Sequence, residues 1–198
     1  MSIINRAKNI LLTPKTEWEA IGRESETPQS LLTKYVIPMA LIPAVALFIG
    51  FGLLEFGVIK WGAIMAIQSF IGSLISYFIC TYVVDALAPN FGSTKNMGRS
   101  AQLVAYSSTA VWVAGIFNII LSLHILQILG LYSIYLFYLG IPPMKNTPED
   151  KRIPYMVVSA VVVIVVGVVV SMILRKIVFA ISGDPFMGMS GGGVFDFR

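Results

Sequence analysis

The feature that most constrains this chain is a series of five long apolar segments joined by short polar connections. The fifth, residues 155–174, has no charged side chain in 20 positions. A helix needs about 20 apolar residues to cross a bilayer, and a chain in lipid must satisfy its backbone hydrogen bonds internally. We therefore predict an all-α fold, a polytopic membrane helical bundle with five transmembrane helices. The predicted spans are residues 35–54, 61–84, 100–121, 125–141 and 155–174.

The composition fits lipid better than water as a solvent. Hydrophobic residues make up 57% of the 198 residues and charged residues 12%, whereas typical globular domains have about 25% charged residues. Five spans leave no room for a separate soluble domain. We divide the chain into a cytoplasmic N-terminal arm (residues 1–33), a five-span transmembrane domain (34–178) and a glycine-rich C-terminal tail (179–198).

The N-terminal arm begins with a short amphipathic pattern. Apolar residues recur at helical spacing over residues 3–11, and Arg6 and Lys8 fall on the opposite face. Such a helix either lies in the interface of an anionic leaflet or packs on the protein's own cytoplasmic surface. Thr13 and Thr27 are each followed by proline, a combination typical of a helix N-terminus. They predict a second short helix and a helical start to the first span.

Lysine and arginine are distributed unevenly between the two sides of the membrane. With the N-terminus inside, ten of the fourteen flank the cytoplasmic side and four the other side. This bias is typical of the positive-inside rule. We predict a multi-pass protein of the cell inner membrane with a cytoplasmic N-terminus and, after five spans, a C-terminus outside.

Small residues repeat at every third or fourth position along the second span. Small side chains let helix backbones approach closely, which is how helices associate in lipid. We predict a helix-packing face on the second span and a similar contact on the fifth. The residues of the second span are Gly62, Ala66, Ser69, Ser73, Ser76 and Cys80, and those of the fifth are Gly167 and Ser171.

The third span is the most polar of the five. Gln102, Tyr106 and Asn118 fall within it, and all three are neutral. Such side chains either line a path for a polar solute or lipid headgroup, or form hydrogen bonds that hold neighbouring helices together.

Asp85, at the boundary of the second span, is the only acidic residue in the predicted spans. A charge at this depth is a candidate functional group. The alternatives are that it ends its helix or pairs with Lys95 or Arg99, which follow closely in the chain.

A row of tyrosines, Tyr132, Tyr135 and Tyr138, marks the fourth span. Aromatic residues at this spacing either bind a ligand or pack and sit at the membrane interface. We expect a tight connection at residues 122–124 before this span and a stop at the two prolines 142–143.

The chain offers no arrangement suited to catalysis. Nucleophile-turn, zinc-protease and phosphate-loop motifs are absent from the sequence. The single Cys80 and the single His124 do not make a metal site. We predict that the protein is not an enzyme and uses no cofactor. The net charge of +4 is dispersed around the spans and does not indicate nucleic-acid binding.

Several segments, in one order and spacing, resemble a known family. They are P-K-T-E-W-E-A-I from Pro14, Y-V-I-P from Tyr35, D-A-L-A-P-N-F-G from Asp85, A-Y-S-S-T from Ala105 and L-G-L-Y-S-I-Y-L-F-Y-L-G-I-P from Leu129. Over residues 10–178 the chain resembles the prokaryotic branch of the YIP family, the Ypt/Rab-interacting proteins.

The resemblance implies five spans and a cytoplasmic N-terminus. Eukaryotic relatives act in vesicle trafficking with Rab GTPases, in membranes of the Golgi and endoplasmic reticulum. Here the N-terminal region is short, and the family's Thr-Pro before the tryptophan is Thr109-Ala110. Both departures argue against a Rab-type GTPase partner.

These observations lead to two hypotheses for function. The first is a non-enzymatic scaffold for membrane organisation or a trafficking-like role, which binds membrane lipids, other membrane proteins or a second copy of itself. The alternative is a small transporter, channel or lipid scramblase. The candidate contacts with lipids or partners are Trp18, Asp85, Gln102, Tyr106, Asn118, Tyr132 and Tyr135.

Overall fold

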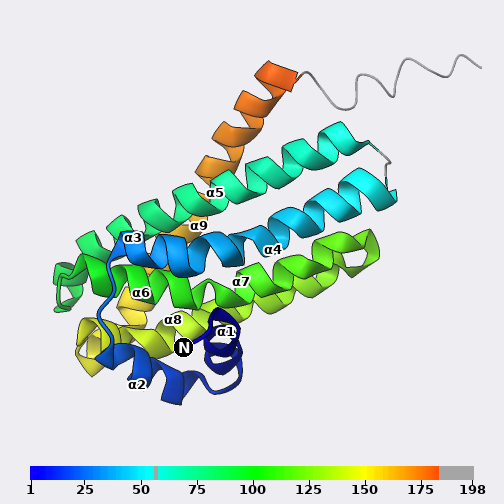
Figure 1. The fold of residues 1–198 in the computed structure, drawn as a ribbon. Helices are drawn as coiled ribbons and strands as arrows, with labels where there is room; N and C mark the ends of the chain where they lie inside the picture. Colours follow the sequence, from blue (N-terminus) through cyan, green and yellow to red (C-terminus); the bar gives the residue numbers. More distant parts are fainter. Residues whose placement is uncertain (56–57, 183–198) are drawn as a thin grey trace, which may run out of the picture.

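The computed structural model describes residues 1–55 and 58–182, and its regular elements are helices (Figure 1). Five helical segments of this part are long and apolar enough to cross a membrane. The prediction of an all-α bundle with five spans is confirmed. Most of the predicted tail, from residue 183 onward, lies outside the described residues. The spans run Pro28–Leu54, Ile59–Phe91, Met97–Ile119, Ser122–Lys145 and Glu149–Val178.

The two ends of the bundle are named here by the position of the N-terminal arm. The arm side holds the turns at residues 92–96 and 146–148, and the arm packs against this half of the bundle. The far side holds the end of the first span at Leu54, the start of the second at Ile59 and the connection near residues 120–121.

The arm consists of two short helices, α1 (Ile3–Leu12) and α2 (Pro14–Arg23), which lie along the flank of the bundle (Figure 1). The Ser2 hydroxyl caps α1 by accepting a hydrogen bond from a backbone N–H of the first turn. Pro14 occupies the first position of α2 as predicted, although Thr13 makes no side-chain cap hydrogen bond.

The first span is distorted around its two prolines. The widened turn of η1 lies directly before Pro38, which has no N–H to continue a regular α-helical ladder. Pro43 packs against the third span at Gly115, where an added Cβ would lie 2.5 Å from the Pro43 Cβ. The elements are α3 (Pro28–Leu31), the π-helical η1 (Leu32–Val36), α4 (Ile37–Leu47) and the π-helical η2 (Phe48–Glu55).

The second and fifth spans are long regular helices that pack on each other. They are α5 (Ile59–Leu87), continued by η3 (Ala88–Phe91), and α9 (Glu149–Ser182). Asp85 lies within α5, so the interpretation that it ends its helix is wrong. The far-side end of α9 projects away from the other helices (Figure 1).

The third span is broken in its middle. It comprises α6 (Met97–Ser107), α7 (Thr109–Ala114) and the 3₁₀ turn η4 (Gly115–Ile119). Non-helical backbone at membrane depth is tolerated where protein surrounds it or where it lines a cavity. Both conditions are met here, as described below.

The fourth span corrects two predictions. Residues 122–124 are not a connection, because they belong to the 3₁₀ helix η5 (Leu121–Leu131). The prolines at 142–143 do not stop the helix, because α8 (Tyr132–Lys145) continues to Lys145. Proline keeps a helical φ, so a helix can continue through it although a backbone hydrogen bond is lost and the ring crowds the preceding turn. The helix ends at Asn146, whose φ is 50° and whose N–H donates to the Pro142 carbonyl at 3.0 Å.

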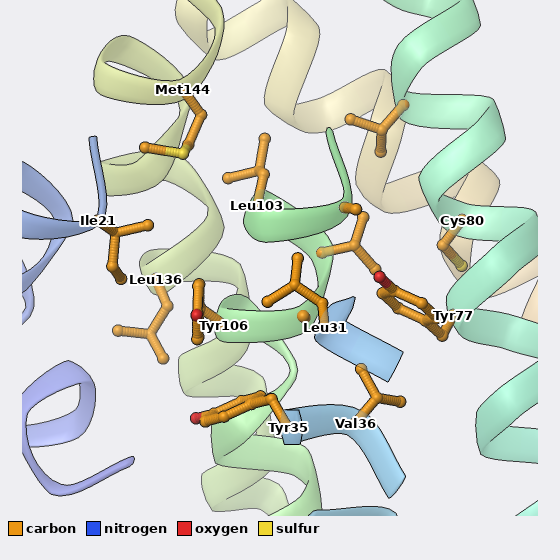
Figure 2. Packing of buried hydrophobic residues seen from close by; sticks show 14 of the residues in the cluster. Ile21, Leu31, Tyr35, Val36, Tyr77, Cys80, Leu103, Tyr106, Leu136 and Met144 are labelled. Atoms are coloured by element: carbon orange, nitrogen blue, oxygen red, sulfur yellow. The ribbon is translucent and has the colours of Figure 1, made fainter. Parts of the chain in front are cut away.

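The core of the bundle lies around α6, in the arm-side half. In the most apolar stretch of the third span 72% of residues are buried, against 11% in the second and fifth spans. Figure 2 shows buried side chains from several elements gathered around Leu103 and Tyr106 of α6. The neighbours include Ile21 of the arm, Tyr35 of the first span and Leu136 of the fourth.

Candidate functional site: buried polar contacts beneath the arm and a cavity among the spans

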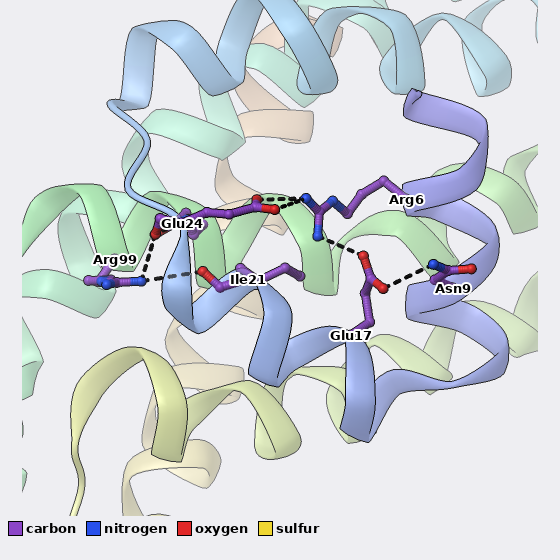
Figure 3. Close-up of polar contacts among 7 residues, drawn as sticks. Arg6, Asn9, Glu17, Ile21, Glu24 and Arg99 are labelled. Carbon is purple, nitrogen blue, oxygen red and sulfur yellow. Dashed lines mark hydrogen bonds and ion pairs between the residues drawn. The ribbon is translucent and has the colours of Figure 1, made fainter. Parts of the chain in front are cut away.

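Arg6 of α1 is buried and joins three parts of the arm (Figure 3). Its guanidinium donates to one Glu17 oxygen at 2.6 Å and to both Glu24 oxygens at 2.5 and 2.6 Å. Asn9 donates to the second Glu17 oxygen at 3.0 Å. Burial opposes the charge on Arg6, but the hydrogen bond with Glu24 and the neighbouring carboxylates raise the pKa of Arg6 above its ordinary value. The cation is therefore a permanent link between α1, α2 and the segment that follows.

Two side chains of α6 hold the other end of the arm. Arg99 and Gln102 both donate to the Glu24 carbonyl, at 2.9 and 3.1 Å (Figure 3 draws the Arg99 bond). Gln102 is fully buried. This predicted site residue faces the arm, and not a path between the spans.

Trp18 is buried where α2 meets the bundle. Its ring lies edge-on to Tyr106 at 6.3 Å between centroids, and Tyr106 in turn contacts Tyr35 at 4.8 Å. A Cβ added to Gly140 of α8 would lie 2.6 Å from Leu103 and 2.7 Å from the Trp18 ring. The absence of a side chain at Gly140 is what allows the Trp18 ring to seat.

Asp85, Lys145 and Ser100 form a second buried cluster, between α5, α8 and α6. The Lys145 Nζ lies 3.2 Å from Asp85 Oδ1 and donates to the Ser100 hydroxyl oxygen at 2.6 Å. The Ser100 hydroxyl donates to the same Asp85 oxygen at 2.9 Å, and so does the Asn96 N–H at 2.8 Å. All three side chains are buried. This cluster closes the arm-side end of three spans.

The partner of Asp85 corrects the sequence interpretation. Neither Lys95 nor Arg99 pairs with it; Arg99 instead binds carbonyl groups of the arm. The predicted stop at the two prolines would leave Lys145 in the loop beyond them, whereas it is the last residue of α8. The available signal was Asp85 itself, because a carboxylate at the end of a span requires a cation from a neighbouring helix end. Which of three nearby cations supplies it depends on the packing of α8 against α6.

The remaining candidate contacts lie apart from these clusters. Tyr132 donates to the Leu11 carbonyl at 3.2 Å and thus supports α1, while Tyr135 is 43% exposed. Asn118 is half-buried on the far side, where it accepts a hydrogen bond from Gln127 at 2.5 Å. The structure does not bring Asn118 near Gln102 or Tyr106 in one polar face.

A cavity of about 990 Å³ lies between α5, the third and fourth spans, and α9. Most of the residues predicted as helix-packing positions line it, and their packing role stays a prediction. Gly62 differs, because an added Cβ would clash with the Gly52 backbone of the first span. Gly167 has no atom within 4 Å of an added Cβ. The predicted positions on the cavity wall are Ser69, Ser73, Ser76, Cys80, Gly167 and Ser171.

The cavity wall is mainly apolar with scattered neutral polar groups. Among the described residues that line it, Arg175 on the far side carries the one permanent charge. Within residues 1–55 and 58–182, no group of three or more His, Cys, Asp and Glu side chains could hold a metal ion. The arrangement is suited to a ligand that is itself largely apolar.

Comparisons with known proteins point to one family. The sequence model of the Yip1 domain matches residues 8–171. The chain is 24% identical over 155 residues to the Inner membrane protein YohC of Escherichia coli strain K12, covering 72% of this chain and 80% of that protein. The YohC protein of E. coli O6:H1 strain CFT073 matches to the same extent. No solved structure gives a significant match.

Proposed function

Because the chain belongs to the Yip1 domain family, we propose that it is a non-enzymatic scaffold of the inner membrane that recruits membrane proteins or lipids through its docked N-terminal arm. The arm would present a fixed surface, and the spans would hold that surface at the membrane.

The observation that carries this proposal is the outward face of α1. Ile4 and Leu12 of α1 are 75% and 69% exposed, as is Met1 just before the helix at 71%, while Arg6 and Ile10 on the inner face are buried. The helix packs on the protein, which was one of the two sequence alternatives, and its outward apolar side chains remain free to contact lipid or a partner. A helix already held by ion pairs loses little conformational freedom on binding, which favours recognition.

The buried charges of the arm side support a structural role. Arg6, Asp85 and Lys145 each bond to side chains within the chain. Groups engaged in this way hold helices together.

Cross-linking in living cells tests the proposal. A photoreactive amino acid placed at Ile4 or Leu12 should give discrete adducts with a membrane protein, a second copy or lipid. The matched control is Ile10, two positions from Leu12 and fully buried, which should give only internal products. The same pattern from all three positions would contradict recruitment by the arm.

The cavity favours a second candidate function, lipid or solute transport. Liposomes containing the protein should then show lipid scrambling or solute leak above empty vesicles, and Gly167→Leu should reduce it by filling the cavity. Tight vesicles would leave the scaffold as the sole candidate.

The proposed orientation places the arm side in the cytoplasm, because the lysine and arginine bias favours that side. A C-terminal reporter that is active only in the cytoplasm should be silent. Strong reporter activity would reverse the orientation.

A further inference from the structure

Three serine hydroxyls on the cavity wall have no hydrogen-bond partner among the described residues. They belong to Ser107 of α6, Ser133 of α8 and Ser159 of α9, and their oxygens are buried. Ser107 and Ser159 are 4% and 0% exposed as whole residues. Buried polar groups are nearly always paired, so an unpaired set is informative.

Other serines on the same cavity wall do have hydrogen-bond partners. A serine at this wall can therefore reach a partner within its own helix. Ser73, Ser108 and Ser171 each donate to the carbonyl four residues earlier in their own helix, at 2.9, 2.8 and 2.7 Å. This local bond is the ordinary arrangement for serine within a helix. The three unpaired hydroxyls depart from it.

The unpaired hydroxyls lie at a common depth. Ser107 and Ser159 follow the arm-side starts of their spans by ten residues, and Ser133 precedes the arm-side end of its span by twelve. At 1.5 Å per residue these positions are about 15–18 Å from that end. Leu136, which is buried, belongs to the core on the arm side of this level. The hydroxyls therefore lie near the inner, arm-side end of the cavity, within about one helical turn of Val104 and Phe137, which also line it.

The rest of the cavity suits a hydrocarbon chain. Beyond the serines the wall continues along α9 through Val163, Ile164 and Gly167. Its volume is at the upper end of the roughly 300–1,000 Å³ of small-molecule sites. Arg175 is sixteen residues beyond Ser159, about 24 Å along the helix, so no permanent charge on the wall lies near the inner end. The far-side end of α9 projects away from the other helices (Figure 1).

We propose that this cavity binds one uncharged lipid of the diacylglycerol type. Its two ester carbonyls and one hydroxyl match the three serine hydroxyls in number and in hydrogen-bonding capacity, and its chains lie along α5 and α9 toward the far side. A charged headgroup would lose its hydration at the inner end without meeting an opposite charge. Water molecules would form hydrogen bonds with the three hydroxyls, but they would not cover the long apolar part of the wall. This inference is independent of the arm.

The test uses the full-length protein in liposomes with a diacylglycerol that carries a photoreactive diazirine on one chain. Phosphatidylglycerol with the same chain serves as the anionic comparison. We expect the diacylglycerol to label peptides of α5 and α9, with labelling reduced about tenfold or more in the triple variant Ser107→Ala, Ser133→Ala, Ser159→Ala, since three hydrogen bonds to the headgroup are lost.

A second triple variant controls for the loss of serine as such. Ser73→Ala, Ser108→Ala and Ser171→Ala remove three hydroxyls from the same wall that already bond to their own helices, and labelling should stay within about twofold of wild type. The first triple variant should melt no lower than wild type, because it removes unpaired buried groups. This separates a binding defect from misfolding.

Three outcomes would overturn the proposal. Equal labelling by phosphatidylglycerol would show an ordinary bilayer groove. Equal loss in both triple variants would show that the unpaired hydroxyls have no special role. The absence of labelling by either lipid would show that the cavity holds no lipid. The cross-linking experiment on the arm tests the scaffold proposal separately, and its result does not depend on any of these outcomes.

Discussion

The arm-side and far-side halves of the bundle are held together differently. On the arm side, α2, α6 and α8 pack around Trp18, and buried ion pairs join the helices. On the far side, the first, third and fourth spans change to π or 3₁₀ turns. The fifth span diverges there, and the cavity opens between the helices.

The difference shows what orders helices in lipid. Lipid tails are as apolar as leucine, so apolar side chains alone give helices little reason to associate. On the arm side, hydrogen bonds and buried charges join the helices. Toward the far side, close glycine contacts hold the first span against the second and third, while the valine-rich surface of α9 is exposed. The predictions below set one half against the other, from the largest effect to the smallest.

Lys145→Met should have the largest effect. It leaves the buried Asp85 carboxylate without its cation, and we expect a loss of about 3–5 kcal/mol in the free energy of unfolding. A denaturing-detergent titration followed by circular dichroism measures it. The double variant Lys145→Met with Asp85→Asn should recover part of the loss, because no unpaired charge remains. Equal stability of Lys145→Met and wild type would show that Asp85 does not need its partner.

Gly140→Ala should have the next largest effect. The added methyl group collides with Leu103 and the Trp18 ring, and overpacking of this kind costs about 1–3 kcal/mol. The arm should loosen, which limited proteolysis between α2 and α3 would detect as faster cleavage. Gly167→Ala is the matched control on the cavity wall, where nothing lies within 4 Å of the new Cβ. Similar cleavage rates in the two variants would remove the contrast between the halves.

Gln102→Leu and Asn118→Leu compare two polar residues of the same span. Gln102 is buried and bonds to the arm, so its loss should cost about 1–2 kcal/mol. Asn118 is half-buried and bonds only to Gln127 among the described residues, so its loss should stay within about 0.5 kcal/mol. Thermal unfolding in detergent distinguishes them. A larger loss of stability in Asn118→Leu than in Gln102→Leu would mean that contacts in the far-side half contribute more to the stability of the fold.

Ser69→Leu should have the smallest effect on stability. A packing face on α5 would be disrupted by leucine, but Ser69 lies on the cavity wall, where a larger side chain has room. We expect a melting temperature within about 2 °C of wild type, corresponding to about 0.5 kcal/mol. A large drop would show that the serine positions pack against another helix in the membrane.

The sequence was sufficient to predict the five spans, because twenty apolar residues in lipid have few alternatives to a helix. It also located the proline at the start of α2 and the polar character of α6. The 3₁₀ helix η5 was missed because apolar composition does not distinguish it from an α-helix. Sequence spacing also placed Lys145 in a loop, since two prolines usually end a helix.

The site was less predictable for a physical reason. Gln102 and Ser107 are both polar positions of α6, yet one faces the arm and the other faces the cavity. Spacing along the helix gives the angle between such residues but not the element that each one meets. The neighbouring element depends on where α1, α2 and α9 pack. Contacts between distant parts of the chain determine this packing.

The link between Asp85 and Lys145 also has a consequence for biosynthesis. The two residues are 60 positions apart, which a ribosome takes roughly 3–12 s to translate at about 5–20 residues per second. During that interval the second span is already made while its counterion is not. We expect a chain interrupted before residue 145 to keep the Asp85 carboxylate without its cation. The late pairing thus distinguishes finished chains from unfinished ones.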